Sequence, residues 1–257
     1  MSEIHLSAAK GYAGAAGNYV AGRPDYPVEV GDWLRDSLKL GPGRQVLDLG
    51  AGTGKFLPRL VATGATITAV EPVAAMRAEI EARFPTVTAL AGTAEAIPLP
   101  DASLDAVVCA QAFHWFAHPA AVAEILRVLR PGGRLGLIWN GRDESVGWVA
   151  TLSQITDARE GNTPRYKSGK WREVVPTPEL PLIDTREARN FHRGTAEQVI
   201  LERTRSTSFI AALPASERDE VLDEVRALIA ATPELAGQAE VAFPYVTSMF
   251  TFEKVAV

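Results

Sequence analysis

The chain alternates between short apolar runs and longer segments in which apolar residues recur every three or four positions. The short runs predict buried parallel strands and the periodic segments predict helices, so their alternation indicates an α/β fold. The predicted strands cover residues 46–49, 65–70, 86–91, 106–110, 134–139, 186–192 and 241–252. The main predicted helices cover residues 28–38, 56–63, 120–129, 146–159, 196–203 and 215–231.

A glycine-rich turn, G-A-G-T-G-K, follows the first predicted strand. Its glycines allow backbone to approach a ligand where a Cβ would collide. A dinucleotide fingerprint would need its third glycine at Lys55, and a phosphate-binding loop would need one more residue before Gly54 and a hydroxyl at Phe56. Neither type of loop fits, although a nucleotide-like ligand is still expected over the turn.

Two further strings restrict the interpretation. G-T-A-E-A-I-P-L-P-D-A-S-L-D covers residues 92–105, and L-R-P-G-G-R-L covers residues 129–135. Together with the glycine turn, they resemble the motifs of class I S-adenosylmethionine-dependent methyltransferases that act on small molecules, especially the ubiquinone-biosynthesis and trans-aconitate group. The resemblance is close over residues 18–140 and looser beyond.

This resemblance implies a doubly wound, seven-stranded, mostly parallel sheet of the Rossmann-like methyltransferase type, with a helical cap from the C-terminal half. Residues 1–45 would form an arm and helix over the cofactor, and residues 46–140 the core that binds S-adenosylmethionine. Residues 141–257 would supply the remaining strands and the cap within one continuous domain. The long loop at 160–181 is expected to form part of a lid over the acceptor.

The resemblance also implies a set of cofactor-binding residues. Glu71 lies about 20 residues beyond the glycine turn, at the end of the second strand, where an acid can accept hydrogen bonds from ribose hydroxyls. NAD carries the same ribose, so this acid alone does not discriminate between the two cofactors. The full set assigned to S-adenosylmethionine, or to its product S-adenosylhomocysteine, is Tyr19, Arg23, Gly50, Ala51, Gly52, Glu71, Met76, Ala94, Glu95 and Ala110.

His114 is the candidate catalytic residue. It lies in Q-A-F-H-W-F, directly after the fourth predicted strand, and ligands of open α/β sheets bind beyond the carboxyl ends of the strands. Its imidazole could serve as a general base for a phenol, a hydroxyl or an activated carbon. Alternatively, it shapes the pocket wall or hydrogen-bonds the backbone, which would suffice for a carboxylate acceptor.

Composition excludes several other classes. The 26 basic and 31 acidic residues give a net charge of -5, which argues against a nucleic-acid partner. The single cysteine, Cys109, excludes an internal disulfide, fits a reducing compartment and is expected to be a buried thiol. No run of ~20 apolar residues suggests a membrane span, and the four histidines are too dispersed to suggest a metal site. We expect a cytoplasmic protein.

The sequence therefore predicts an enzyme that moves a methyl group from S-adenosylmethionine to a small-molecule acceptor. Two alternatives stay open: a non-catalytic regulator that binds the same cofactor, and a nicotinamide-dependent oxidoreductase. Lys55 and the motif around Glu95 oppose the latter. The acceptor, the atom methylated and the oligomeric state are left open.

Overall fold

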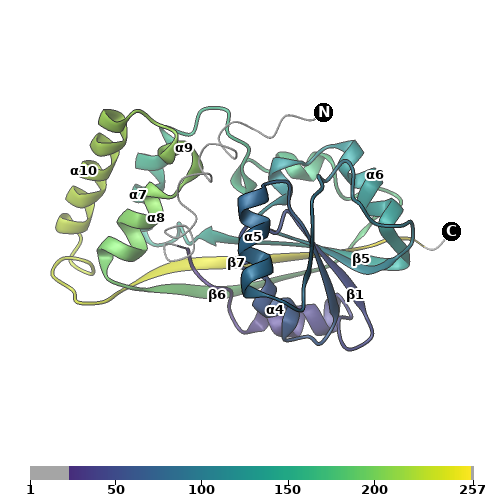
Figure 1. The fold of residues 1–257 in the computed structure, drawn as a ribbon. Helices are drawn as coiled ribbons and strands as arrows, with labels where there is room; N and C mark the ends of the chain where they lie inside the picture. The colour runs from purple at the N-terminus through teal and green to yellow at the C-terminus, as the bar shows by residue number, and fades with distance from the viewer. Residues whose placement is uncertain (1–22, 256–257) are drawn as a thin grey trace. The chain divides into compact units, whose positions relative to one another are not determined.

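Seven strands form one sheet in the order β3-β2-β1-β4-β5-β7-β6 (Figure 1). The computed structural model describes residues 23–255 of the chain. The strands are β1 (Gln45–Leu49), β2 (Thr66–Val70), β3 (Thr88–Leu90), β4 (Leu104–Ala110), β5 (Leu129–Arg142), β6 (Leu182–Gly194) and β7 (Val241–Glu253). The seven-stranded, mostly parallel α/β fold predicted from the sequence is confirmed.

The strand order reverses between β1 and β4. β1 pairs in parallel with β2 on one side, where Leu49 faces Val70, and with β4 on the other. β4 in turn pairs in parallel with β5, where Ala110 faces Ile138. The carboxyl ends of these four strands therefore lie at one edge, and the chains leaving β1 and β4 diverge there, which makes it the ligand-binding position of a doubly wound sheet.

Helices and short turns connect the strands. The α-helices are α3 (Glu29–Asp32), α4 (Leu57–Val61), α5 (Ala74–Arg83), α6 (Pro119–Val128), α7 (Gly147–Asp157), α8 (Arg203–Arg205), α9 (Ser208–Ala211) and α10 (Ala215–Ala231). The 3-10 turns are η2 (Phe113–Trp115), η3 (Tyr166–Ser168) and η4 (Lys170–Glu173), and the π-helical turns are η1 (Trp33–Ser37) and η5 (Glu197–Glu202).

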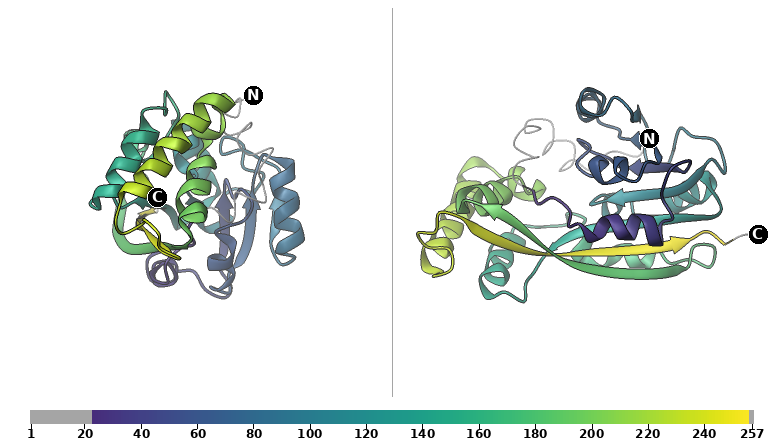
Figure 2. Two further views of the ribbon diagram at one scale, coloured as in Figure 1. Left: turned by 90° about the vertical axis from the view of Figure 1, so that its left-hand side faces the viewer. Right: turned by 90° about the horizontal axis from the view of Figure 1, so that it is seen from below.

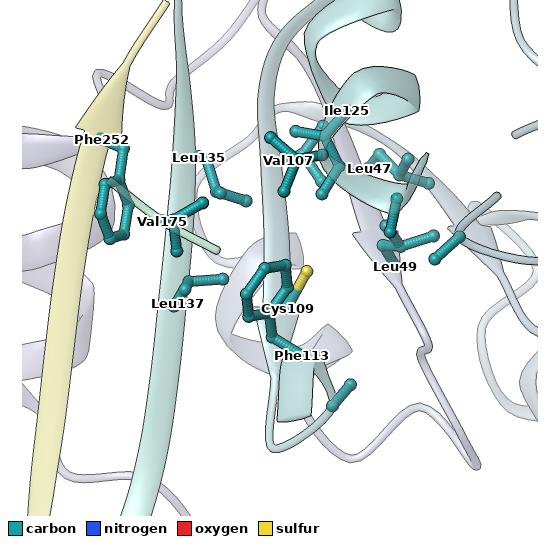
Figure 3. Close-up of a cluster of buried hydrophobic side chains, with 14 of the residues drawn as sticks. Leu47, Leu49, Val107, Cys109, Phe113, Ile125, Leu135, Leu137, Val175 and Phe252 are labelled. Atoms are coloured by element: carbon teal, nitrogen blue, oxygen red, sulfur yellow. The ribbon is translucent and has the colours of Figure 1, made fainter. Parts of the chain in front are cut away.

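Successive residues of the parallel strands supply two different apolar cores, one on each face of the sheet. In β4, Val107 and Cys109 join the core that includes α6, whereas Ala106 and Val108 join the core that includes η1, α4 and α5. Figure 3 shows the first of these cores around Cys109. The thiol is fully buried and burial raises its pKa well above the ordinary value, so the expectation of a buried cysteine is confirmed.

The chain divides into two compact units. The core unit comprises Tyr26–Trp139, Pro164–Ala188 and the residues from Thr247 onward. The second unit comprises Asn140–Thr163, Arg189–Val246 and the described part of residues 1–25. The second unit has its own apolar cluster, formed by residues of α7, η5, α10 and the first half of β7. β6 and β7 run side by side in Figure 2, and each contributes residues to both units.

Several segments differ from their predicted bounds, and contacts in the structure explain two of these differences. β5 begins at Leu129 rather than at residue 134, because the amide of Gly132 donates to the carbonyl of Lys254 and the carbonyl of Gly133 accepts from the amide of Lys254. The segment predicted as a loop at 160–181 contains the turns η3 and η4, and Trp171 within it is buried in the core unit. The proposed limits of the arm, core and cap stay a prediction.

Candidate functional site at the carboxyl ends of the strands

The glycine turn leaves β1 in a conformation that glycine adopts readily. Gly50, Gly52 and Gly54 all have positive φ, at 73°, 57° and 78°. The amide groups of Gly50 and Ala51 donate to the carbonyl of Val70 over 2.9 and 3.3 Å, which joins the start of the turn to the end of β2. A side chain at any of the three glycines would strain the backbone.

Glu71 connects the same two strand ends through its side chain. Its Oε2 accepts from the backbone amide of Gly52 over 3.0 Å, and its Oε1 accepts from the amide of Val73 over 2.9 Å. Burial raises the pKa of Glu71, although these two amides act in the opposite direction. The carboxyl group is therefore held against the glycine turn, with further lone pairs for a hydroxyl donor.

The three glycines differ in what a side chain at each position would contact. A Cβ on Gly54 would lie 2.8 Å from Cδ1 of Leu57, so the side chain of Leu57 would have to shift to admit it. A Cβ on Gly50 would lie 3.0 Å from Cβ of Ala112 and 3.2 Å from Phe116, so the turn after β1 touches the segment after β4. A Cβ on Gly52 would meet no atom of residues 23–255 within 4 Å. Within this part of the chain, Gly52 is thus the member of the turn that faces open space.

Asp48 is a functional candidate that the sequence analysis includes only in the first predicted strand, residues 46–49. It lies near the end of β1, fully buried, and neither carboxyl oxygen has a hydrogen-bond partner among residues 23–255. Burial, with a smaller contribution from the charge of Glu71, raises the pKa of Asp48 to about 7. An unpaired buried carboxyl is costly, which is typical of a group awaiting a cationic or hydrogen-bond-donating partner.

The loop after β3 carries Ala94 and Glu95. Ala94 is buried, and the carboxylate of Glu95 lies 2.7 Å from Nε2 of His118. Burial acts to raise the pKa of Glu95. Hydrogen bonds from Thr93 and His118 act in the opposite direction and hold this pKa below its ordinary value. His118 also caps α6, since its Nδ1 accepts from the amide of Ala121 over 3.4 Å. Glu95 is therefore anchored to the start of α6.

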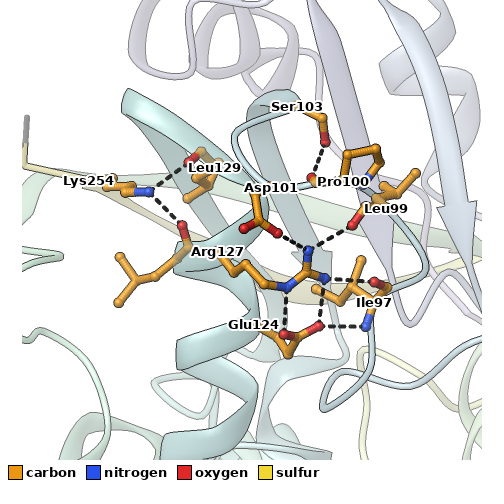
Figure 4. A network of polar contacts seen from close by, with 10 residues as sticks. Ile97, Leu99, Pro100, Asp101, Ser103, Glu124, Arg127, Leu129 and Lys254 are labelled. Carbon is orange, nitrogen blue, oxygen red and sulfur yellow. Dashed lines mark hydrogen bonds and ion pairs between the residues drawn. The ribbon is translucent and has the colours of Figure 1, made fainter.

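The rest of this loop is fixed by Arg127 of α6 (Figure 4). The guanidinium donates to the backbone carbonyls of Ile97 and Leu99, each over 2.8 Å, and to the carboxylate of Asp101 over 2.7 Å. Glu124, one turn earlier, pairs with Arg127 and accepts from the amide of Ile97 over 2.9 Å. The pair holds a loop that has no regular secondary structure of its own between residues 97 and 101.

His114 lies in η2, directly after β4, and is half-buried. Its Nδ1 is 3.1 Å from Nε1 of Trp139, which lies near the end of β5. Trp139 stacks on Tyr166 with ring centroids 4.6 Å apart and lies tilted against Trp171 at 4.9 Å, so the loop predicted as a lid contributes both rings to an aromatic cluster. The sequence alone places Trp139 only at the end of the fifth predicted strand.

Most of the predicted site residues come together at this edge. Ala110 ends β4, Met76 is buried in the first turn of α5, and the glycine turn, Glu71, Ala94, Glu95 and His114 belong to the same core unit. Arg23 is half-buried and belongs to the second unit, and Tyr19 lies outside the described residues. Contacts of these residues with a cofactor stay predictions.

Residues 23–255 contain neither a cluster of metal ligands nor a helix suited to span a membrane. In that part of the chain, no three His, Cys, Asp or Glu side chains gather as metal ligands would. The helices of the same range are each too short or too polar to cross a bilayer.

Comparison with known proteins identifies the relatives of this chain. Residues 47–137 match the methyltransferase domain family model. An uncharacterised methyltransferase of Mycobacterium tuberculosis is 43% identical over 236 residues, covering 92% of each chain. A methyltransferase-like protein of Schizosaccharomyces pombe is 38% identical over 238 residues, covering 92% of this chain and 93% of the relative.

A solved structure agrees with these sequence relatives. A candidate type II methyltransferase of Anaeromyxobacter dehalogenans superposes with a TM-score of 0.68 at 26% identity, covering 91% of this chain and 97% of that one. These relatives favour neither of the two alternative functions, a non-catalytic regulator that binds the cofactor or a nicotinamide-dependent oxidoreductase.

Proposed function

This chain belongs to the class I S-adenosylmethionine-dependent methyltransferases, and we propose that it binds the cofactor at the carboxyl ends of β1, β2 and β4. The observation that carries this assignment is the contact between Glu71 and the glycine turn. A buried carboxylate at the end of β2, bonded to the amide of Gly52, suits recognition of a ribose beside a turn that a ligand can approach closely.

The other residues of the site fit the same cofactor. S-adenosylmethionine carries an ammonium group and a sulfonium, and the unpaired carboxyl of Asp48 would be stabilised in its charged form by a nearby cation. The open space at Gly52 would accommodate the approach of a ligand. Ala94, Glu95 and Met76 would then border the adenine, as the family resemblance implies.

Bound S-adenosylmethionine supplies a methyl group on sulfur that is already activated for displacement. The chain has to align the acceptor, exclude water and, for some acceptors, manage a proton. His114 and the aromatic residues around it would line the acceptor side, since they follow β4 and β5 at the same edge. A small acceptor is favoured over a nucleic acid by the net charge of -5. The buried thiol of Cys109 fits a reducing, cytoplasmic setting.

Calorimetric titration with S-adenosylmethionine, S-adenosylhomocysteine and NAD tests the assignment. We expect the first two to bind and Glu71→Ala to weaken them by about 5- to 150-fold, which corresponds to about 1–3 kcal/mol for lost buried hydrogen bonds. Glu81→Ala is the matched control, because Glu81 is exposed on α5. Binding of NAD alone, or equal affinities in both variants, would refute the site.

A further inference from the structure

The hydrogen bond between Trp139 and His114 constrains where the proton of His114 lies. Nε1 of Trp139 is 3.1 Å from Nδ1 of His114. The indole N–H is a donor only and accepts nothing, so Nδ1 must be the acceptor. A neutral imidazole with an accepting Nδ1 carries its proton on Nε2.

The packing of Trp139 fixes the direction in which its indole N–H donates this hydrogen bond. The indole is 1% exposed and lies among three aromatic rings of the core unit. It stacks on Tyr166 at an interplanar angle of 20°, lies beside Trp171 at 33° and meets Phe250 edge-on at 66°. The direction of the indole N–H is therefore set by the rings around it, and adding a proton to Nδ1 of His114 would place two N–H groups against each other.

The backbone holds the two residues in register. The amide of Gln111, which directly follows β4, donates to the carbonyl of Ile138 over 2.9 Å. Trp139 is the next residue along β5, and His114 lies one turn beyond Gln111 in η2. Both side chains thus leave neighbouring strand ends at the position where the acceptor is expected.

We propose that Trp139 keeps His114 neutral and protonated on Nε2, so that His114 donates a hydrogen bond to an anionic oxygen of the methyl acceptor instead of removing its proton. This inference rests on the proposed function. An acceptor that presents a carboxylate or an ionised phenol needs no base: its oxygen bonds to the methyl carbon as the carbon–sulfur bond breaks. The electron pair of the broken bond stays on sulfur, the charges of oxygen and sulfonium cancel, and no proton has to move.

The first test measures the tautomer directly. In protein labelled with 15N-histidine, two-bond proton–nitrogen correlations distinguish protonation on Nε2 from protonation on Nδ1, and His114→Gln identifies the signals of His114. His118 is an internal reference for the Nε2-protonated form, since its Nδ1 accepts from an amide and its Nε2 contacts Glu95. We expect His114 to show the same pattern in the wild-type protein near neutral pH and to become a mixture of tautomers in Trp139→Phe.

The second test addresses the donor role with the cofactor product present. Protein saturated with S-adenosylhomocysteine is titrated with benzoate, 4-nitrophenolate or neutral benzamide while the Nε2 proton of His114 is observed. We expect one of the two anions to shift the resonance of the Nε2 proton and benzamide to leave it in place. A shift with benzoate would indicate a carboxylate site, and a shift with 4-nitrophenolate would indicate a phenolate site. An Nδ1-protonated or imidazolium form in the wild-type protein, or no response to either anion, would overturn the proposal. Failure of S-adenosylhomocysteine to bind would instead refute the proposed function, since the tautomer is measured without it.

Discussion

At the scale of single residues, Asp48 is the group whose charge should most affect folding. Its pKa is about 7 in the folded chain, against an ordinary value of 3.8 that applies once the chain unfolds. Between these two values the folded state binds more protons than the unfolded state, so stability falls as pH rises from about 4 to about 7. At about 1.4 kcal/mol for each pH unit, the loss is on the order of 4 kcal/mol and is complete above pH 7.

Asp48→Asn should remove this dependence, because an amide does not ionise. Urea unfolding of the protein without cofactor, measured from pH 4.5 to 8, should show a smaller decline for the variant than for the wild type. Asp219→Asn is the matched control, since Asp219 is exposed on α10. Parallel pH profiles for Asp48→Asn and wild type would contradict a strongly raised pKa.

Two glycines of the same turn should respond differently to alanine. Gly54→Ala adds a collision with Leu57 to backbone strain, so we expect it to lower the free energy of unfolding by about 2–4 kcal/mol. Gly52→Ala introduces the strain alone, about 1–2 kcal/mol, but places a methyl group in the space assigned to the ligand. Chemical denaturation of both variants should therefore show the larger loss of stability in Gly54→Ala. Calorimetric titration should show that Gly52→Ala loses more affinity for S-adenosylmethionine in proportion to its loss of stability. The reverse order would mean that Gly52 faces no ligand.

At the scale of elements, α6 holds the loop after β3 through Arg127. Arg127→Met would leave the carbonyls of Ile97 and Leu99 without this donor, and we expect a loss of about 1–3 kcal/mol in stability. Hydrogen exchange should accelerate within residues 92–101, and cofactor affinity should fall although Arg127 itself is assigned no ligand contact. Arg35→Met serves as the control, because Arg35 is 64% exposed and pairs only with neighbours on its own helical segment among the contacts described. Unchanged exchange in the loop would show that it holds its conformation without α6.

The elements differ in how much of them the sequence could predict. β1, the glycine turn and β2 were predictable because apolar runs and glycine spacing are local properties, and Glu71 follows from its distance along the chain. The bond between Trp139 and His114 joins residues 25 positions apart and depends on strand register, which local patterns do not specify. The burial of Trp171 among the core aromatics likewise arises from tertiary packing, which the composition of its loop does not specify.

At the scale of the whole molecule, one chain builds two compact units, and each unit has buried apolar residues of its own. β5, β6 and β7 each begin in one unit and end in the other, while the glycine turn, Glu71 and His114 all belong to the core unit. Leu152, on α7, is fully buried in the cluster of the second unit, and Leu137, on β5, is fully buried in the core unit. The same leucine-to-alanine change can therefore be made in either unit.

Each substitution should cost about 2–5 kcal/mol, because it removes buried carbons and leaves a cavity. Hydrogen exchange should accelerate mainly within residues 140–163 and 189–246 for Leu152→Ala, and mainly within residues 26–139 for Leu137→Ala. Because the assigned cofactor contacts other than Tyr19 and Arg23 lie in the core unit, Leu152→Ala should leave S-adenosylmethionine affinity nearly unchanged under conditions where both variants stay folded. An affinity loss in Leu152→Ala as large as that in Leu137→Ala would show that residues of the second unit hold the cofactor, and would direct the search to Arg23.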